Sequence, residues 1–396
     1  MAPPKMLLPT LNWEGRFLVE NSDDVMTPAL LIYPDAIASN IGATLKVLHG
    51  NADRWRAHVK TAKLAFTMRM MADRGVTNFK CATTLELLVA CQSGARDVLV
   101  AYPVVGANAR RVREIADSFP GVRVSILAEN EAQAIQWRGS RVGVFLDINP
   151  GMDRTGVEQD HHAEIVGLVG AIQNAGLEFR GLHYYDGHFG GVDESERVAA
   201  AHRGYERLLA VVAAVEQSGA SVEEVITAGT PTFPASASFQ GFHGKRFVHR
   251  ISPGTIVYND ATSLAQLPSS LGLKPAVLVM TRVVSHPHSG KITCDAGHKS
   301  VSADAGLPTC VVVGHPELTP LGPSEEHLPM SVAEGSTPPK VGEILYLLPR
   351  HVCPTVNNFD LALVVRDNKI DSLEKVSARG REIPFLGEVP RSAAAS

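Results

Sequence analysis

The feature that most constrains this fold is a regular alternation of short apolar runs and longer helical stretches between residues 29 and 229. The runs are rich in β-branched residues, and several of the helical stretches between them close on glycine, as helices commonly do. This alternation is typical of a parallel sheet whose strands are joined by helices. The strand-like runs are residues 29–34, 56–61, 78–83, 97–102, 123–128, 141–149, 179–186 and 224–229.

Eight such runs within about 200 residues predict a (β/α)₈ TIM barrel rather than an open doubly wound sheet. A dinucleotide-binding fold is further disfavoured because no GxGxxG follows the first run. We therefore expect residues 29–264 to form an α/β barrel.

The pattern changes after about residue 265, where strand-like runs follow one another without long helices and with Gly/Pro turns between them. This change predicts a second, β-rich domain over residues 265–396. Residues 1–28 fit neither pattern, and we expect them to pack on the β-rich domain.

Composition limits the classes of function. A net charge of −4 over 396 residues gives no reason to expect nucleic acid or a membrane surface as partner, which leaves small-molecule chemistry. Five cysteines without a CxxC do not form a disulfide framework and suit a reducing, cytoplasmic compartment. We find neither a signal-peptide apolar region nor a membrane span.

Several polar residues follow the expected strands at their carboxyl ends, where barrels of this kind carry their active sites. Taken singly, each is more often a structural residue, but their joint placement on one rim favours an active site. The residues are Lys60, Arg154, His183, Tyr185, His188, Gly229 and Thr230.

A barrel with a lysine at a strand end and a phosphate-binding turn suggests pyridoxal phosphate. That cofactor needs a lysine, a polar partner for its ring and a phosphate site. Lys60, Arg154 and the Gly229–Thr230 turn could supply these groups. A Schiff-base aldolase acting on a sugar phosphate would use similar groups, so these residues leave both classes open.

His351 and Cys353 stand two apart in the β-rich part, and on an extended segment their side chains would share one face. An imidazole and a thiolate favour Zn²⁺ over Mn²⁺ or Mg²⁺, although these remain possible. Two protein ligands leave coordination positions open, as a catalytic metal requires.

The motifs "RAHVKTAK", "GMDRTGV", "YYDGH", "SPGTIVYND", "SEEH" and "HVCPTVN" together span about residues 30–360. With them the chain resembles the fold-type III pyridoxal phosphate enzymes of the D-threonine aldolase/D-serine dehydratase group, whose barrel is like that of alanine racemase. The resemblance implies a homodimer that acts on D-amino acids bearing a β-hydroxyl, with Lys60 as the Schiff-base lysine and a metal on His351 and Cys353. The cofactor-binding set is then His58, Lys60, Arg154, Tyr185, Gly229, Thr230, Gly254, Thr255 and Tyr258.

Two positions bear on the reaction. Family members often carry histidine where this chain has Ala62, so any role of that imidazole is absent or moved. The second metal ligand is typically aspartate in the aldolases and cysteine in the dehydratases, and this chain has Cys353. We therefore favour dehydration and deamination of a substrate such as D-serine or D-3-hydroxyaspartate to a keto acid and ammonia.

The alternative is retro-aldol cleavage to glycine and an aldehyde, for which His188, Glu326 or His327 could serve as the base. A racemase, or a non-catalytic protein that binds pyridoxal phosphate, would be readings of another class. The metal-ligand pair and the β-rich domain count against both.

Overall fold

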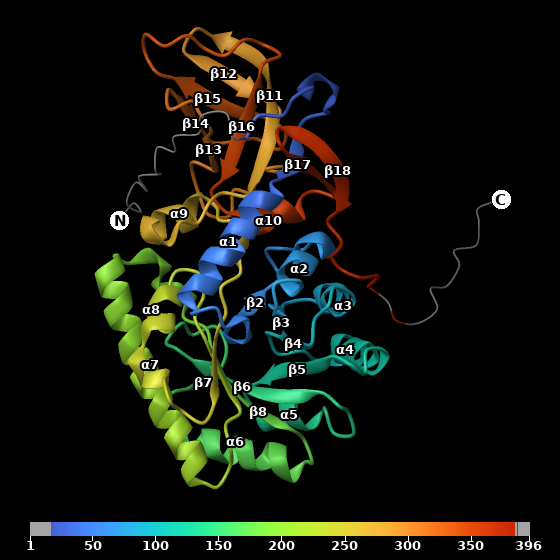
Figure 1. Ribbon diagram of the computed structural model, residues 1–396, viewed down its shortest axis with the longest axis vertical. Coiled ribbons are helices and arrows are strands. Elements are labelled where there is room, and N and C mark those ends of the chain that lie inside the picture. The colour runs from blue at the N-terminus through green and yellow to red at the C-terminus, as the bar shows by residue number, and fades with distance from the viewer. Residues whose placement is uncertain (1–16, 385, 387–396) are drawn as a thin grey trace, which may run out of the picture.

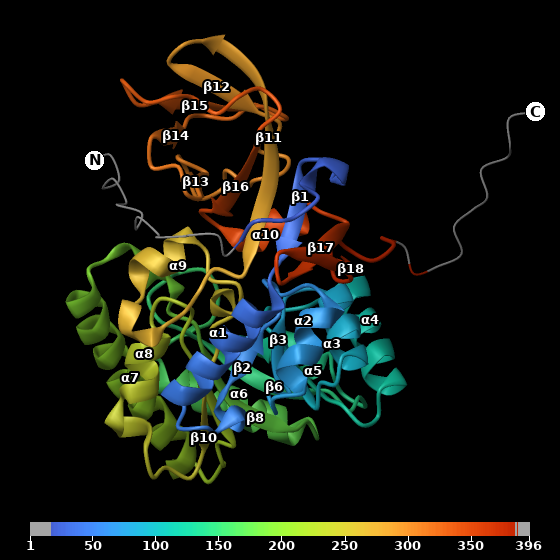
Figure 2. The same ribbon diagram turned by 45° about the horizontal axis from the view of Figure 1, so that its top comes forward.

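The structure is a computed structural model that describes residues 17–384 and residue 386. It contains a parallel barrel surrounded by helices and a β-rich sheet that stands on one end of the barrel (Figure 1). In the second view, the long strand β11 runs from the barrel boundary to the outer hairpin that it makes with β12 (Figure 2).

The barrel strands follow one another in the order β10-β9-β8-β6-β5-β4-β3-β2, all in parallel. A parallel bridge between Trp55 and Ile251 joins the two ends of this order. The predicted α/β barrel is confirmed. Its strands are β2 (Arg56–His58), β3 (Asn78–Cys81), β4 (Asp97–Val100), β5 (Arg123–Ala128), β6 (Gly143–Asn149), β8 (Phe179–Tyr184), β9 (Glu224–Thr227) and β10 (Val248–Ile251), and the short β7 (Val157–Glu158) pairs with β6.

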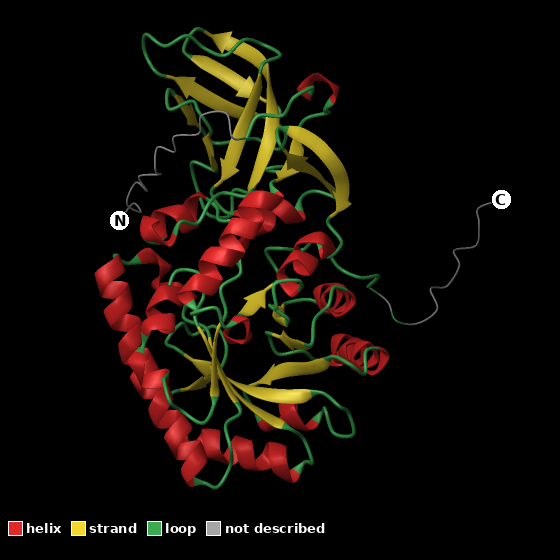
Figure 3. Cartoon of the chain, in the orientation of Figure 1, coloured by secondary structure: helices red, strands yellow, loops and turns green. Residues whose placement is uncertain are grey.

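Helices cover the outside of the barrel (Figure 3). Their apolar faces pack on the strands; α4, for example, buries Val112 and Ile115 and leaves charged residues outside. The helices are α1 (Pro34–Val47), α2 (Ala65–Ala72), α3 (Thr84–Gln92), α4 (Gly106–Ser118), α5 (Glu131–Ile135), α6 (His162–Asn174), α7 (Glu194–Gln217), α8 (Phe233–Ser238) and α9 (Ala261–Gln266).

The prediction that residues 29–34 form a strand of the barrel is wrong, because this strand belongs to the β-rich sheet. Strand β1 (Ala29–Ile32) pairs with β11 and β17 of the β-rich sheet, with Leu31 opposite Leu278. Strand β10 takes the eighth place in the barrel. Its sequence hid it because His249 and Arg250 are polar, yet both are buried and hydrogen-bonded to Thr227 and Glu224.

The β-rich sheet follows the barrel in the chain. Its strands are β11 (Val277–His288), β12 (Lys291–Cys294), β13 (Cys310–Val312), β14 (Leu318–Pro320), β15 (Leu328–Val332), β16 (Ile344–Pro349), β17 (Leu361–Arg366) and β18 (Lys369–Lys375), with helix α10 (Val352–Asn357) between β16 and β17. Residues 1–16 of the expected N-terminal segment lie outside the described residues. From the remainder, the Val19 N–H donates to the Tyr346 hydroxyl at 3.0 Å and the Glu20 N–H to the Asn368 carbonyl at 2.7 Å.

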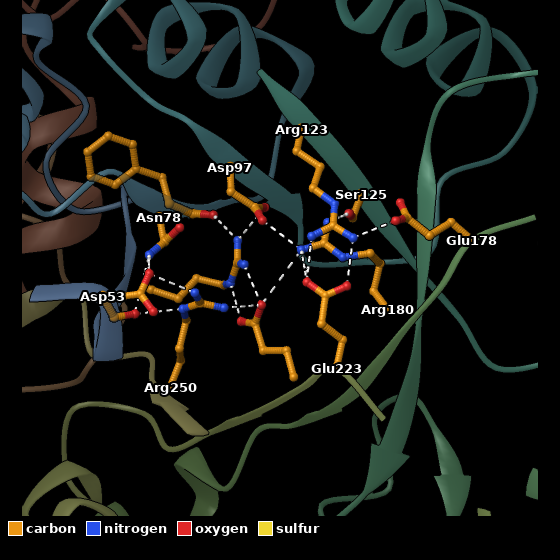
Figure 4. A network of polar contacts seen from close by, with 12 residues as sticks. Asp53, Asn78, Asp97, Arg123, Ser125, Glu178, Arg180, Glu223 and Arg250 are labelled. Atoms are coloured by element: carbon orange, nitrogen blue, oxygen red, sulfur yellow. Dashed lines mark hydrogen bonds and ion pairs between the residues drawn. The ribbon is translucent and has the colours of Figure 1, made fainter. Parts of the chain in front are cut away.

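Buried charges fill the barrel at the amino-terminal ends of its strands (Figure 4). Arg56, Arg180 and Glu224 are fully buried there, and Asp97 bridges the two arginines at 2.9 and 2.7 Å. We call this group, together with Arg250, the barrel floor. Because it closes one end, a cavity that admits a ligand has to open at the other end, where the strands finish.

Within the described residues, none of the helices is both long and apolar enough to cross a membrane.

Candidate active site

A cavity of about 270 Å³ lies at the carboxyl ends of the barrel strands, where the barrel meets the β-rich part. Residues from both parts line it, which explains how motifs nearly 300 positions apart in the chain come together. Of the predicted site residues, those on its wall are His58, Lys60, Tyr185, Gly229, Thr230, Gly254, Thr255, His351 and Cys353.

Lys60 stands just beyond the end of β2, half-buried in the cavity wall. Its backbone N–H donates to the Nδ1 atom of His58 at 3.3 Å. Burial, and then the neighbouring charges of Lys60 and Lys80, hold the pKa of His58 well below its ordinary value. His58 is therefore neutral, and it can accept this bond at Nδ1.

The ring of Tyr185 is the point on which three cations converge. Its centroid lies 4.8 Å from the guanidinium carbon of Arg154, 5.5 Å from Lys80 Nζ and 5.9 Å from Lys60 Nζ. An aromatic face attracts cations, but a negatively charged ligand would attract them more strongly. Arg154 is thus brought next to the cavity, although it does not form part of its wall.

Lys80 is a residue of this site that sequence analysis missed. It lies on β3 in register with His58, its side chain is buried inside the barrel, and Nζ is 3.3 Å from His183 Nε2. His183 Nδ1 lies 2.7 Å from Asp147, so the contacts cross the barrel from β3 through β8 to β6. Burial and the adjacent Lys60 charge lower the pKa of Lys80 to about 7. The sequence feature that could have indicated Lys80 is a lysine within an otherwise apolar strand.

The loop that holds Gly254 has the shape of an anion site. A Cβ on Gly254 would lie 2.4 Å from the His58 carbonyl oxygen, so only glycine fits there. The Ser252 hydroxyl lines the same cavity, is buried, and has no hydrogen-bond partner within the described part of the chain. Because buried hydroxyls are normally hydrogen-bonded, this unpaired one fits a site where a ligand supplies the partner. The residues present therefore fit the phosphate of the expected cofactor, and Arg154 and Lys80 fit its negative ring oxygen.

Two details of this phosphate site differ from expectation. The Gly229 N–H already donates to Asp186 Oδ1 at 3.1 Å, and the Thr255 N–H donates to Thr230 Oγ1 at 3.3 Å, so the hydroxyls of Ser252 and Thr230 are left to donate to an anion. Tyr258 lies behind the wall, where its hydroxyl donates to the Ala62 carbonyl at 2.8 Å.

His351 and Cys353 reach the cavity from the start of α10, not from the extended segment that the sequence suggested. His351 precedes the helix and Cys353 lies in its first turn, and both line the wall. His351 Nδ1 is 2.7 Å from Asp304 Oδ2, which leaves Nε2 for another partner. Burial disfavours the imidazolium, but Cys353 and Asp304 outweigh it and raise the pKa of His351 to about 9. For Cys353, burial opposes the thiolate, but His351 and Lys60 lower the pKa.

These two side chains can supply two ligands to a metal. Over residues 17–384, no group of three or more His, Cys, Asp or Glu side chains is arranged to hold a metal ion. A metal held by this pair would therefore have to complete its coordination with water or substrate.

The three residues expected as a second base are not brought to the cavity wall. His188 is exposed and its ring lies 4.0 Å from that of Phe189. Glu326 and His327 are exposed before β15, and Glu326 pairs with Lys299 at 3.2 Å. Lys60 and His58 are thus the basic side chains that the barrel itself contributes to the cavity wall.

Comparison with known proteins agrees with this geometry. Residues 32–262, more than half of the chain, match the family described as "Alanine racemase, N-terminal domain". The chain belongs to this family. Residues 276–365 match a second description, "Putative serine dehydratase domain", so this family member carries the β-rich domain expected of the D-threonine aldolase/D-serine dehydratase group.

Relatives of this family member cover nearly its whole length. It is 28% identical to the D-threonine aldolase of Arthrobacter sp over 85% of this chain and 89% of the relative. It is 27% identical to the 3-hydroxy-D-aspartate aldolase of Paracoccus denitrificans over 91% and 94%. Among solved structures, the D-threonine aldolase of Filomicrobium marinum matches with a TM-score of 0.82 at 29% identity, over 92% of this chain and 98% of that one.

The D-threo-3-hydroxyaspartate dehydratase of Delftia sp. HT23 matches with a TM-score of 0.78 at 19% identity, over 91% of this chain and 99% of that one, which supports the fold alone. A variant of a D-threo-3-hydroxyaspartate dehydratase, 19% identical to this chain, has been solved in a metal-free form, which implies a metal in that protein.

Proposed function

We propose that this chain is a lyase that uses pyridoxal phosphate and a divalent metal to act on D-β-hydroxy-α-amino acids. The observation that carries the proposal is that Lys60, the Gly254 loop and the His351/Cys353 pair face one cavity. One cavity wall thus carries a lysine, a loop that can bind an anion and two residues that can bind a metal. This arrangement suits a substrate whose amino and β-hydroxyl groups are bound at the same time.

Each part has a role in this proposal. Lys60 holds the cofactor, and the Gly254–Thr255 loop, Thr230 and Ser252 hold its phosphate. When bound, the cofactor supplies an electron sink for negative charge at the substrate Cα. His351 and Cys353 hold the metal, which supplies a Lewis acid for a hydroxyl group. Arg154 and Lys80 balance the negative ring oxygen.

Among reactions of this class, we favour elimination of the β-hydroxyl as water, followed by hydrolysis of the resulting imine, in which a water molecule supplies the keto oxygen and ammonia leaves. Elimination needs one base to take the Cα proton, and Lys60 stands on the cavity wall where it can do so. His188, Glu326 and His327, the side chains expected as an additional base for aldol cleavage, lie outside the wall. The cysteine at position 353, which is typical of the dehydratases, points the same way.

Retro-aldol cleavage to glycine and an aldehyde is the second candidate. The relatives described above at 27–29% identity over nearly the whole chain are all named aldolases. Cleavage needs a base at the β-hydroxyl rather than at Cα. The imidazole of His58 is on the wall and could serve if its Nδ1 releases the Lys60 N–H.

The deciding experiment is product analysis. D-serine, D-threonine and D-3-hydroxyaspartate, with their L-enantiomers as controls, are incubated with the protein in the presence of zinc or of a chelator. Keto acid and ammonia identify elimination, whereas glycine and an aldehyde identify cleavage. Racemised substrate that forms despite the chelator would replace the proposal with a racemase. Absence of any product would leave a non-catalytic cofactor-binding protein.

A further inference from the structure

The sulfur of Cys353 contacts two barrel hydroxyls. Its Sγ atom lies 3.0 Å from Thr61 Oγ1 and 3.7 Å from Thr255 Oγ1. Thr61 is fully buried and Cys353 is 8% exposed, so water does not compete effectively for the shorter contact. The predicted metal ligand is therefore fixed partly by the barrel and not by the β-rich part alone.

Both hydroxyls belong to the segments proposed to hold the cofactor. Thr61 directly follows Lys60, and Thr255 directly follows Gly254. The segment around Lys60 is tightly closed, because the Lys63 N–H donates to the Val59 carbonyl at 2.9 Å. A shift of the Lys60 backbone therefore displaces Thr61 as well.

We propose that Thr61 is a positioning residue that makes cofactor binding at Lys60 and metal binding at Cys353 cooperative. The inference rests on the proposed function. A metal-bound cysteine carries no proton, so in that state the Thr61 hydroxyl must be the donor and Sγ the acceptor. A cofactor attached to Lys60 restricts the segment that carries this donor, and the metal then meets a sulfur whose hydrogen bond is already in place.

Because linkage is reciprocal, the metal strengthens cofactor binding by the same factor. The coupling has a defined sign, and each ligand tightens the binding of the other. Removing the Thr61 hydroxyl should abolish the coupling while leaving both sites able to bind.

The test measures zinc affinity of the full-length protein by competition with a chromophoric chelator. One sample carries pyridoxal phosphate and has been desalted to remove the excess, and the other has been stripped of cofactor with hydroxylamine. We expect zinc to bind roughly fivefold or more tightly to the cofactor-bound sample. Cofactor affinity, measured with and without zinc, should change by the same factor.

Three variants show whether Thr61 carries the effect. Thr61→Val keeps the shape of the side chain but removes the hydroxyl, and should reduce the factor to about one. Thr61→Ser keeps a hydroxyl and should retain most of it. Thr44→Val removes a hydroxyl of equal burial that bonds the Asn40 carbonyl within α1 and not the sulfur, and should leave the factor unchanged.

The outcomes separate this inference from the proposed function. If the parent protein binds zinc and cofactor with affinities that do not depend on each other, the coupling is overturned and the proposed function stands. A Thr61→Val protein that keeps the full factor overturns the role of Thr61. If the parent protein binds neither zinc nor pyridoxal phosphate, the proposed function fails and the coupling fails with it.

Discussion

Arg56 and Glu224 face each other through two hydrogen bonds of 2.7 Å, and neither side chain is exposed to solvent. This pair belongs to the barrel floor, because Arg56 and Glu224 are the first residues of β2 and β9, whereas the cavity lies at the carboxyl ends of the strands. Removing one partner would leave an uncompensated charge in the interior, which is more costly than the loss of the pair itself.

Glu224→Ala should therefore lower the free energy of unfolding by about 3–5 kcal/mol. Urea denaturation followed by circular dichroism measures the change. Asp160→Ala is the control, because Asp160 pairs with Arg207 at the surface, where both side chains are more than half exposed, and such pairs contribute about 0–1 kcal/mol. Equal effects of the two substitutions would contradict the importance of the floor.

The floor also predicts how stability depends on pH. Burial opposes the charge on Asp97, but Arg56 and Arg180 outweigh it and hold the pKa of Asp97 below its usual range. In the unfolded chain the pKa of this carboxyl group is about 3.9. Below that pH the Asp97 carboxylate becomes protonated in the unfolded chain but stays ionised in the folded chain. The contribution of Asp97 to the free energy of unfolding is therefore complete above about pH 5 and is lost on acidification.

The parent protein should therefore exceed Asp97→Asn in free energy of unfolding at pH 6, and the difference should shrink towards pH 3. Denaturation curves of both proteins across this range test it. A difference that stays constant with pH would show that Asp97 titrates alike in the two states.

Lys60 should be the residue that holds the cofactor. Purified protein should be yellow, and borohydride reduction should fix the cofactor on the peptide that contains Lys60, as mass spectrometry can establish. Lys80 is the rival, since it is buried against the same tyrosine ring. Label on the Lys80 peptide, or label that persists in Lys60→Ala, would reject the assignment.

The phosphate loop should tolerate no added bulk. Thr230→Arg and Gly254→Val should each weaken retention of pyridoxal phosphate by about tenfold or more, which corresponds to about 1.4 kcal/mol. At Gly254 the reason is that an added Cβ would lie 2.4 Å from the His58 carbonyl oxygen. Gly170→Val in α6 is the matched control, since a Cβ there meets nothing within 4 Å. Cofactor release is followed by ultrafiltration. Retention equal to that of the control would argue against the phosphate site.

His351→Ala and Cys353→Ala should each remove the metal and abolish lyase turnover. The cofactor should remain bound through its lysine and phosphate loop, which belong to the barrel, but more weakly by the coupling factor defined above. Metal content by atomic absorption and the cofactor absorbance measure the two effects separately. A chelator should reproduce the loss in the parent protein, and zinc should restore activity only there. Cys353→Asp should shift the preference towards harder ions such as Mn²⁺. Full activity of the alanine variants after metal removal would contradict the prediction and show that His351 and Cys353 serve only in packing.

Local patterns in the sequence were sufficient to predict the barrel, the β-rich part and the main chemical groups. A short continuous apolar run reveals a strand buried on both faces, and a polar side chain directly after it reveals the carboxyl rim, as for Lys60. Such a run cannot reveal which sheet a strand joins. The buried run at β1 has apolar residues on both faces, and only pairing with β11 and β17 decides that it leaves the barrel.

The sequence by itself therefore determined the class of fold, because strands and helices follow from residue type and short-range spacing. It also predicted Lys60 and the histidine–cysteine pair, whereas the Gly254 loop was expected only from the resemblance to a known family. Only the tertiary structure decided that Lys80 lies buried beside the cavity, that Asp186 occupies the Gly229 amide, and that Glu326 and His327 stand away from the cavity wall. Hydrogen-bond partners and burial depend on segments far apart in the chain, and closure of the barrel sets those distances.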